Sequence, residues 1–179
     1  IELDRSSHDR PVDILHDGFD CVIRTGASPE DGVIARPLGK LTVVNCASPH
    51  YLTRFGYPQS PDDLTSHAIV RYTPHLGVHP LGFEVASVNG VQWFKSGGML
   101  TVNSRENYLA AGLAGLGIIQ IPRIAVREAL RAGRLIEVLP GYRAEPLSLS
   151  LIYPQRRELS RRVNLFMQWL AGVMKEYLD

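Results

Sequence analysis

The sequence has few cysteines and no long apolar run. Only Cys21 and Cys46 occur among 179 residues, and both lie in apolar, strand-like runs. Such a pair does not provide the disulfide framework of a small secreted protein, so a reducing setting is the simpler interpretation. No signal peptide opens the sequence, and no apolar run approaches the roughly 20 residues that a membrane helix needs. We therefore expect a soluble, cytoplasmic protein without a membrane partner.

The sequence also lacks a large excess of charge of either sign. Lys and Arg number 19 against 18 Asp and Glu, which gives a formal net charge of +1. A domain that binds DNA over a large surface needs a positive field around the phosphates. This stretch of chain is therefore not expected to bind DNA well by itself.

Motifs of several enzyme classes are missing. The sequence contains no G-x-S-x-G nucleophile elbow, no H-E-x-x-H zinc motif and no P-loop. The glycines within residues 112–117 end a helical pattern, whereas those of a dinucleotide fingerprint precede a helix. His75 and His79, with His67 nearby, stand among prolines and glycines that prevent one continuous helix. We predict no enzyme activity, no cofactor and no metal site.

What is present is an alternation of strand-like and helix-like segments. Hydrophobic residues make up 45% of the chain, enough for a sizeable core in one domain or two lobes. The alternation predicts an α/β fold with a largely parallel sheet. Strands are expected at residues 19–24, 41–47, 68–72, 118–121, 135–139 and 147–153, with a hairpin over 83–94 turned at Asn89-Gly90. Helices are expected to begin after Ser48 and Ser60, at Asn103, at Pro122 and at Ser160, the last with a core stripe through Val173.

The most informative stretch is residues 103–122, NSRENYLAAGLAGLGIIQIP. Asn103, with Glu106 three residues on, forms a capping-box variant that predicts a helix start. The amides of the next three residues would then lack intrahelical partners and could hold an anion. Gly117 is expected to end this helix, and the isoleucines after it to form a central strand covered on both faces.

Five strings, in order along the chain, resemble the effector-binding domain of LysR-type transcriptional regulators. They are RPVDILHDGFDCVIRTG at 10–26, CASPHYLTRFGYPQSPDDLTSHAIVRY at 46–72, LTVNSRENYLAAGLAGLGIIQIP at 100–122, AGRLIEVLP at 132–140 and LSLSLIYPQRRELSRRVNLFMQWL at 147–170. No single string is diagnostic, because each is a short run of Gly, Pro and apolar residues. Their order and spacing carry the resemblance, which covers nearly the whole chain.

The resemblance implies two α/β lobes joined by two crossing strands, similar to periplasmic binding proteins of type 2. The crossings are expected at 41–47 and 147–154, so that lobe I comprises 1–44 plus 155–179 and lobe II comprises 45–154. Lobe I of the family normally begins upstream with a strand and a helix, so we expect it to be incomplete at its N-terminus. The family's winged helix-turn-helix domain and linker helix also lie outside this sequence.

The function implied by the resemblance is that of a ligand sensor. A small, anionic effector held between the lobes would favour one lobe arrangement and so change how the DNA-binding domains sit on an operator. The resemblance also implies a homodimer or tetramer that contacts DNA only through the N-terminal domain. A solute-binding protein of a transport system and an α/β enzyme are the alternatives.

Candidate effector-binding residues come from both expected lobes. They are Ser7, His8, Arg24 and Thr25 in lobe I, and Ser48, Tyr72, Asn103, Ser104 and Arg105 in lobe II. The Arg24 guanidinium is suited to pair bidentately with a carboxylate. The helix start at Asn103 offers backbone amides to an anion whatever its side chains do.

Each candidate also has a purely structural interpretation. Ser7 and His8 suit a polar loop before a helix, and Arg24 suits a structural ion pair. Ser48 is better explained as a helix cap than as a ligand contact, and Tyr72 as a half-buried core aromatic. The helix start near Asn103 remains the best candidate, with capping alone as its alternative.

Overall fold

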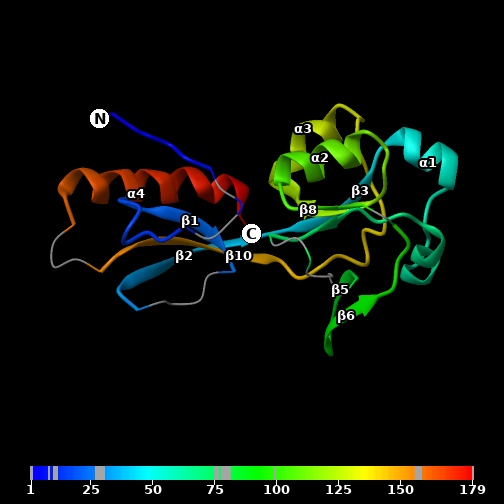
Figure 1. Cartoon of the computed structure of the whole chain (residues 1–179), viewed down its shortest axis with the longest axis horizontal. Coiled ribbons are helices and arrows are strands. Elements are labelled where there is room, and N and C mark those ends of the chain that lie inside the picture. Colours follow the sequence, from blue (N-terminus) through cyan, green and yellow to red (C-terminus); the bar gives the residue numbers. More distant parts are fainter. Residues whose placement is uncertain are drawn as a thin grey trace. The chain divides into compact units, whose positions relative to one another are not determined.

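The computed structural model describes residues 2–7, 9, 12–26, 31–74, 77, 82–98, 100–155 and 159–178. It divides into two compact units (Figure 1), unit 1 with Ile1–Thr42 and Pro146–Asp179 and unit 2 with Val43–Glu145. The functional lobes expected at 1–44 plus 155–179 and at 45–154 remain a prediction. Within the described ranges, no helix has the length and apolar character to cross a membrane.

Unit 1 contains a three-stranded antiparallel sheet. Its strand order is β1 (Val22–Thr25), β10 (Leu147–Pro154) and β2 (Val33–Leu41), with a register shift at Leu149/Ser150. The expected strand at 41–47 is therefore two strands, because β2 ends at Leu41 and the next strand starts after Thr42.

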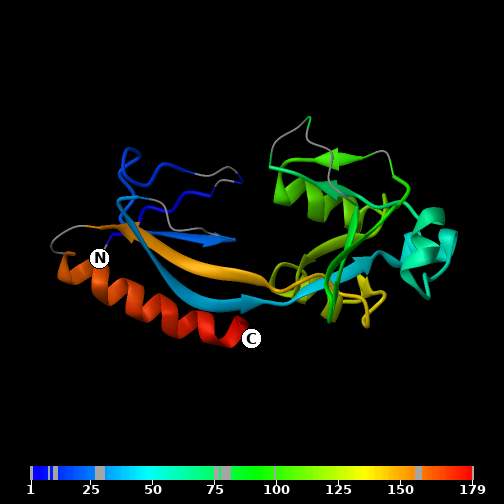
Figure 2. The same cartoon turned by 90° about the horizontal axis from the view of Figure 1, so that it is seen from below.

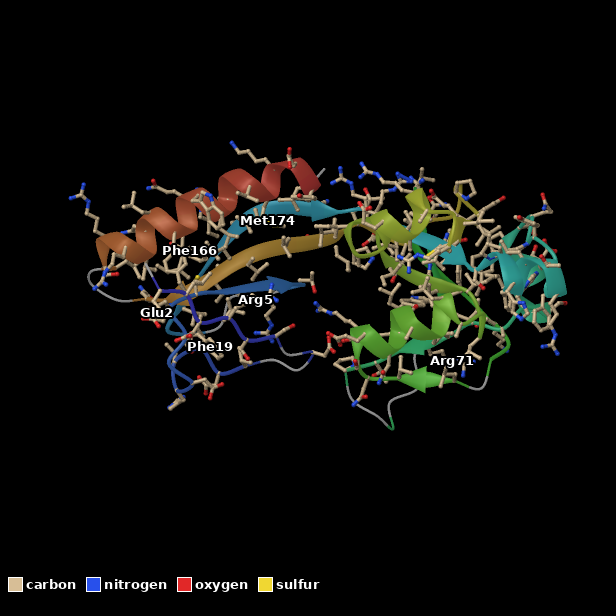
Figure 3. All side chains as sticks on the ribbon, turned by 90° about the horizontal axis from the view of Figure 1, so that it is seen from above. Glu2, Arg5, Phe19, Arg71, Phe166 and Met174 are labelled. Carbon is tan, nitrogen blue, oxygen red and sulfur yellow. The ribbon has the colours of Figure 1, made fainter. Side chains whose placement is uncertain are left out.

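Helix α4 (Arg161–Met174) runs along this sheet and continues into the short helix η2 (Lys175–Tyr177) (Figures 1 and 2). Its predicted start is confirmed, since the hydroxyl of Ser160 accepts a hydrogen bond from the amide of Val163 at 3.3 Å. The half-buried Phe166 and Met174 lie on the side that faces the strands (Figure 3). The predicted core stripe is wrong at Val173, which is 41% exposed and forms an outward apolar row with Leu165 and Trp169.

Unit 2 is built around β3 (Val43–Ala47), whose five residues are all buried. β3 pairs antiparallel with β8 (Ile119–Pro122) on one side and with β9 (Ile136–Glu137) on the other. The strand expected at 118–121 is present as β8, but its expected central position is wrong, because β8 is an outer strand of this three-stranded sheet and β3 is its centre. Helices α2 (Arg105–Leu113) and α3 (Arg123–Arg131) lie on one side of these strands in Figure 1.

Parallel pairing is confined to a small part of unit 2. β4 (Arg71–Tyr72) pairs with β7 (Thr101–Val102), and single parallel bridges join Ala68 to Gly97 and Ile69 to Ile118. The expectation of a largely parallel sheet is wrong, because the other paired strands in the described ranges run antiparallel.

Hairpin β5 (Phe83–Ser87) and β6 (Gly90–Phe94) lies across β3 and β8 from α2 and α3 (Figure 1). Ser87 pairs with Gly90, so the two turn residues are Val88 and Asn89 rather than the predicted Asn89-Gly90. Neither turn residue has the positive φ that a type I′ turn requires, and Gly90 takes a φ of +105° instead. The hairpin itself is confirmed, and its turn lies one residue earlier.

The two faces of β3 and β8 contribute to different cores. One core, beneath α2 and α3, consists of Val44, Cys46, Val70, Tyr108, Ala111, Ile119, Ile121, Val126, Ala129 and Leu135. The other lies beneath α1 (Pro49–Phe55) and the hairpin and includes Ala47, Tyr51, Leu52, Leu64, Ile69, Phe83, Val85, Ile118, Val138 and Leu139. The predicted starts after Ser48 and Ser60 are confirmed, although the second segment is the 3-10 helix η1 (Pro61–Ser66).

Candidate functional site

Several of the predicted residues meet where β4 and β7 end. Because the two strands are parallel and Tyr72 pairs with Val102, the residues that follow them lie at the same edge. The amide of Thr73 donates to the carbonyl of Val102 at 3.0 Å, which extends the pairing by one residue. Asn103 and Ser104 follow β7 directly and lead into α2. Tyr72, Thr73, Asn103 and Ser104 form what we call the strand-end cluster, at the kind of edge where α/β folds bind ligands.

The start of α2 differs by one residue from the prediction. Ser104, not Asn103, is the N-cap: its backbone is extended and its hydroxyl accepts a hydrogen bond from the amide of Asn107 at 3.4 Å. The same hydroxyl donates to a carboxylate oxygen of Glu106 at 2.8 Å. Asn103 therefore has a half-buried side chain that is not used as the cap.

Glu106 places a negative charge at the positive end of the α2 dipole. Hydrogen bonds from its own amide and from the Ser104 hydroxyl, together with nearby Arg105, lower the pKa of its carboxyl. An ionised carboxylate in the first turn stabilises a helix and partly neutralises the field of its free amides. An anionic ligand at this helix start would therefore have to compete with Glu106.

Tyr72 lies beside the α2 core. Its ring is tilted against that of Tyr108, with centroids 5.7 Å apart, and it packs against the core beneath α2. This is the half-buried aromatic position that the structural interpretation predicts. Its backbone belongs to the strand-end cluster through the pairing of β4 with β7.

Ser48 lies away from the strand-end cluster. It is buried and caps α1, accepting a hydrogen bond from the amide of Tyr51 at 3.3 Å. Gly115, just after the end of α2, is so close that a Cβ there would meet the Ser48 hydroxyl at 3.1 Å. Since nine helical residues span about 13 Å, the structure places Ser48 beside one end of α2 and Ser104 at the other.

Two of the four candidates in unit 1 lie on β1. Arg24 and Thr25 are its last two residues, both half-buried, and pair with Ser150 and Leu149 of β10. Ser7 is exposed and outside any strand. His8 lies outside the described residues, as do His75 and His79.

Burial disfavours the thiolate form of both cysteines. Burial raises the pKa of Cys46 to about 12, and burial also raises the pKa of the half-buried Cys21. Among the described residues, no group of three or more His, Cys, Asp or Glu side chains could hold a metal ion. His67 hydrogen bonds through Nδ1 to the hydroxyl of Tyr51 at 3.0 Å.

Sequence reasoning missed Thr73, the competing charge of Glu106 and a pair of amides, the buried Asn45 and the half-buried Gln120. A signal for the pair was present, because each is the single polar residue within an otherwise apolar strand. A buried polar side chain needs hydrogen-bond partners, so an isolated amide in such a run indicates a specific contact.

The comparisons with known proteins agree on one family. A family model described as the LysR substrate binding domain matches residues 1–175. The HTH-type transcriptional regulator YhjC of Escherichia coli strain K12 is 96% identical over 179 residues, covering 100% of this chain and 60% of that protein. The HTH-type transcriptional activator AaeR of the same strain is 30% identical over 166 residues, covering 92% of this chain and 52% of that protein.

Solved structures agree on the fold. The regulatory domain of CrgA from Neisseria meningitidis superposes with a TM-score of 0.77 at 24% identity, covering 89% of this chain and 78% of that one. The effector domain of AmpR from Pseudomonas aeruginosa gives a TM-score of 0.72 at 21% identity, covering 93% and 76%. These likenesses confirm the predicted α/β fold of the periplasmic binding protein type 2 class. The chain spans about half to three fifths of the length of the two regulators to which it is similar.

Proposed function

The chain belongs to the LysR substrate-binding domain family, the effector-sensing part of transcriptional regulators, and we propose that its effector is a small anion bound at the strand-end cluster. The observation that carries this proposal is the meeting of two parallel strand ends with the N-terminus of α2. Helix starts attract anions through their free amides and dipole. Asn103 has a side chain that is not used for capping, and Arg105 adds a positive charge nearby.

For the whole protein, we propose a cytoplasmic regulator that acts as a homodimer or tetramer. It would contact DNA through an N-terminal winged helix-turn-helix domain and change its operator binding when the effector binds. It remains a prediction from the resemblance that the same effector is contacted by Ser7, His8, Arg24 and Thr25. We assign Ser48 to the start of α1 rather than to the ligand, because its hydroxyl caps that helix.

A thermal-shift screen of the full-length protein tests the ligand class. The panel pairs small carboxylates with their neutral amides, for example benzoate with benzamide and succinate with succinamide. A ligand that binds only the folded protein at 100 times its Kd stabilises it by about 2.7 kcal/mol. We expect at least one acid to raise the Tm while its amide does not. Equal shifts from an acid and its amide would contradict an anion site.

Glu106 provides a test of where the anion binds. Glu106→Gln removes the resident charge while keeping the size of the side chain, so an acid found in the screen should bind roughly two- to fivefold more tightly. The matched control is Glu128→Gln on α3, an exposed glutamate in another helix. If Glu106→Gln and Glu128→Gln have the same affinity as the unchanged protein, the anion does not bind at the start of α2.

Arg24→Ala and Arg24→Lys test the contribution expected from unit 1. A bidentate carboxylate contact should be lost in both variants, because lysine lacks the planar fork of the guanidinium. Calorimetry with the same acid should therefore show weaker binding in both. Unchanged affinity would remove Arg24 from the site without affecting the proposal for α2.

DNA binding separates the regulator from a solute-binding protein, the alternative with the same fold. A mobility-shift assay with the full-length protein and its own promoter region should show a complex whose affinity changes on addition of the acid. Absence of any specific complex would favour the transport function.

A further inference from the structure

Two amide side chains, the buried Asn45 on β3 and the half-buried Gln120 on β8, lie directly opposite each other in the sheet of unit 2. They occupy the face that points towards the hairpin, away from α2 and α3. Gln120 donates from Nε2 to Oδ1 of Asn45 at 2.9 Å. An amide buried without partners would cost the fold several kcal/mol in desolvation, so their remaining contacts show what the pair holds in place.

Gln120 holds the hairpin on one side and α2 on the other. Its side chain pairs with Glu84 of β5 as a backbone group would, accepting from the Glu84 amide at 2.9 Å and donating to the Glu84 carbonyl at 2.8 Å. Its own backbone amide donates to the hydroxyl of Tyr108 at 2.9 Å. Tyr108 lies in the second turn of α2 and is buried in the core beneath that helix.

Asn45 holds the segment by which the chain leaves unit 2, residues 138–145. Its Nδ2 donates to the carbonyl of Leu139 at 3.2 Å and to that of Tyr142 at 2.9 Å. Its backbone carbonyl accepts from the amide of Val138 at 2.9 Å. Both Nδ2 hydrogens of Asn45 are thus directed to this exit segment, and Oδ1 accepts from Gln120.

The hairpin binds the rest of the exit segment. The amide of Ala86 donates to the carbonyl of Arg143 at 2.8 Å, and the Glu84 carboxylate accepts from the amide of Glu145 at 3.0 Å. Leu139 has a φ of +48°, the one positive value outside glycine among the residues that the structure describes. A non-glycine residue keeps such a conformation when its surroundings hold it there, and here Asn45 holds its carbonyl.

We propose that Asn45 and Gln120 are positioning residues that couple helix α2 to the exit segment, residues 138–145. The connection runs from the Tyr108 hydroxyl through the Gln120 backbone and side chain to Asn45 and to the carbonyls of Leu139 and Tyr142. α2 begins at the strand-end cluster, and residues 138–145 lead directly into β10. The coupling stands on these contacts alone, whereas its use in signalling rests on the proposed function.

Hydrogen exchange of the full-length protein, measured without any ligand, tests this coupling. Tyr108→Phe removes a hydroxyl that has no direct contact with residues 138–145, yet the amides of Val138, Tyr142 and Glu145 should exchange on the order of tenfold faster, since one lost hydrogen bond is worth about 1 kcal/mol or more. The matched control is Tyr51→Phe. The Tyr51 hydroxyl also accepts a hydrogen bond from a half-buried backbone amide, that of Ala68, at 2.9 Å.

The control separates a hydrogen-bonded connection from general loosening. Tyr51 belongs to the same apolar core as Val138 and Leu139, whereas Tyr108 belongs to the other core. If packing alone linked the exit segment to the rest of unit 2, Tyr51→Phe would have the larger effect on residues 138–145. We expect the reverse. A Tyr108→Phe effect no larger than that of Tyr51→Phe would overturn the coupling.

A double variant tests the route. Asn45→Ala removes the contact to Leu139 and Tyr142. If the effect travels through the paired amides, adding Tyr108→Phe to Asn45→Ala should raise the exchange rates at residues 138–145 little further. Additive effects would mean that α2 reaches the segment by another path. Because no effector is used, a failure of this experiment is distinct from a failure of the anion proposal.

Discussion

Replacing Asn45 by aspartate should destabilise unit 2 more than replacing it by alanine. Asn45 is fully buried and donates to two carbonyl oxygens, those of Leu139 and Tyr142. Asn45→Ala removes both bonds; the carbonyl of Leu139 keeps the bond from the amide of Tyr142, whereas that of Tyr142 loses its partner, so we expect a cost of about 1–3 kcal/mol. Asn45→Asp has nearly the same shape but directs a carboxylate oxygen at the two carbonyls. An uncompensated buried charge costs about 3–5 kcal/mol, so the isosteric change should be the worse one.

The pH dependence of Asn45→Asp supplies a second check. Burial and the facing carbonyls should raise the pKa of the new carboxyl in the folded state above its unfolded value of about 3.9. The folded state then binds more protons than the unfolded state between the two pKa values. The free energy of unfolding should therefore be highest at low pH and fall as the pH rises through the folded pKa. Asn45→Ala should show no such additional slope.

Both the destabilisation and its pH dependence can be measured by urea unfolding at pH 5 and pH 8. Hydrogen exchange of the β3 amides reports the unfolding of unit 2. The reasoning predicts a lower midpoint for Asn45→Asp than for Asn45→Ala at pH 8 and a smaller gap between them at pH 5. If Asn45→Asp is as stable as the unchanged protein at pH 8, the buried hydrogen bonds of Asn45 are not those described here.

Three further predictions concern packing, acid stability and thiol reactivity. Gly117→Ala should lower the free energy of unfolding, measured with urea, by about 2–3 kcal/mol, because a Cβ there would lie 2.6 Å from the carbonyl oxygen of Ala68. Gly133→Ala, with open space and a φ of +66°, should cost about 1 kcal/mol. Burial lowers the pKa of His67 in the folded state, so the unfolded state binds more protons. The free energy of unfolding should therefore fall as the pH drops through about 6.5, and His67→Gln should reduce this dependence on pH. Iodoacetamide labelling followed by mass spectrometry should modify Cys21 before unfolding and Cys46 only after it. Equal costs for the two glycine substitutions, equal pH slopes for His67→Gln and the unchanged protein, or labelling of Cys46 before unfolding would contradict the respective prediction.

Local signals in the sequence predicted helix starts well. A serine followed by proline marks the starts of α1 and η1, and Ser160 marks the start of α4, because the chemistry of a cap is contained in three or four neighbouring residues. The same reasoning placed the α2 cap one residue early. Asn103 and Ser104 are both good cap residues, and only the backbone geometry shows that Ser104 takes the position.

Strand direction could not be read from local patterns. An apolar run has the same composition in a parallel and an antiparallel pair, so the alternation of strands and helices suggested a parallel sheet, whereas β3 pairs antiparallel on both sides. The same limit applies to the site. Ser48 and Ser104 are both cap serines after strands, and only the fold shows that they lie beside opposite ends of α2.

The most direct test of the effector site is a calorimetric titration of an acid found in the screen into the unchanged full-length protein, Asn103→Ala and Asn164→Ala. Asn103 belongs to the strand-end cluster and does not cap α2, whereas Asn164 is an exposed asparagine on α4 in unit 1. Loss of a hydrogen bond to a charged ligand should cost about 1.5–3 kcal/mol. The account predicts that Asn103→Ala raises the Kd at least tenfold while Asn164→Ala leaves it unchanged. An Asn103→Ala protein that binds the acid as tightly as the unchanged protein would contradict it.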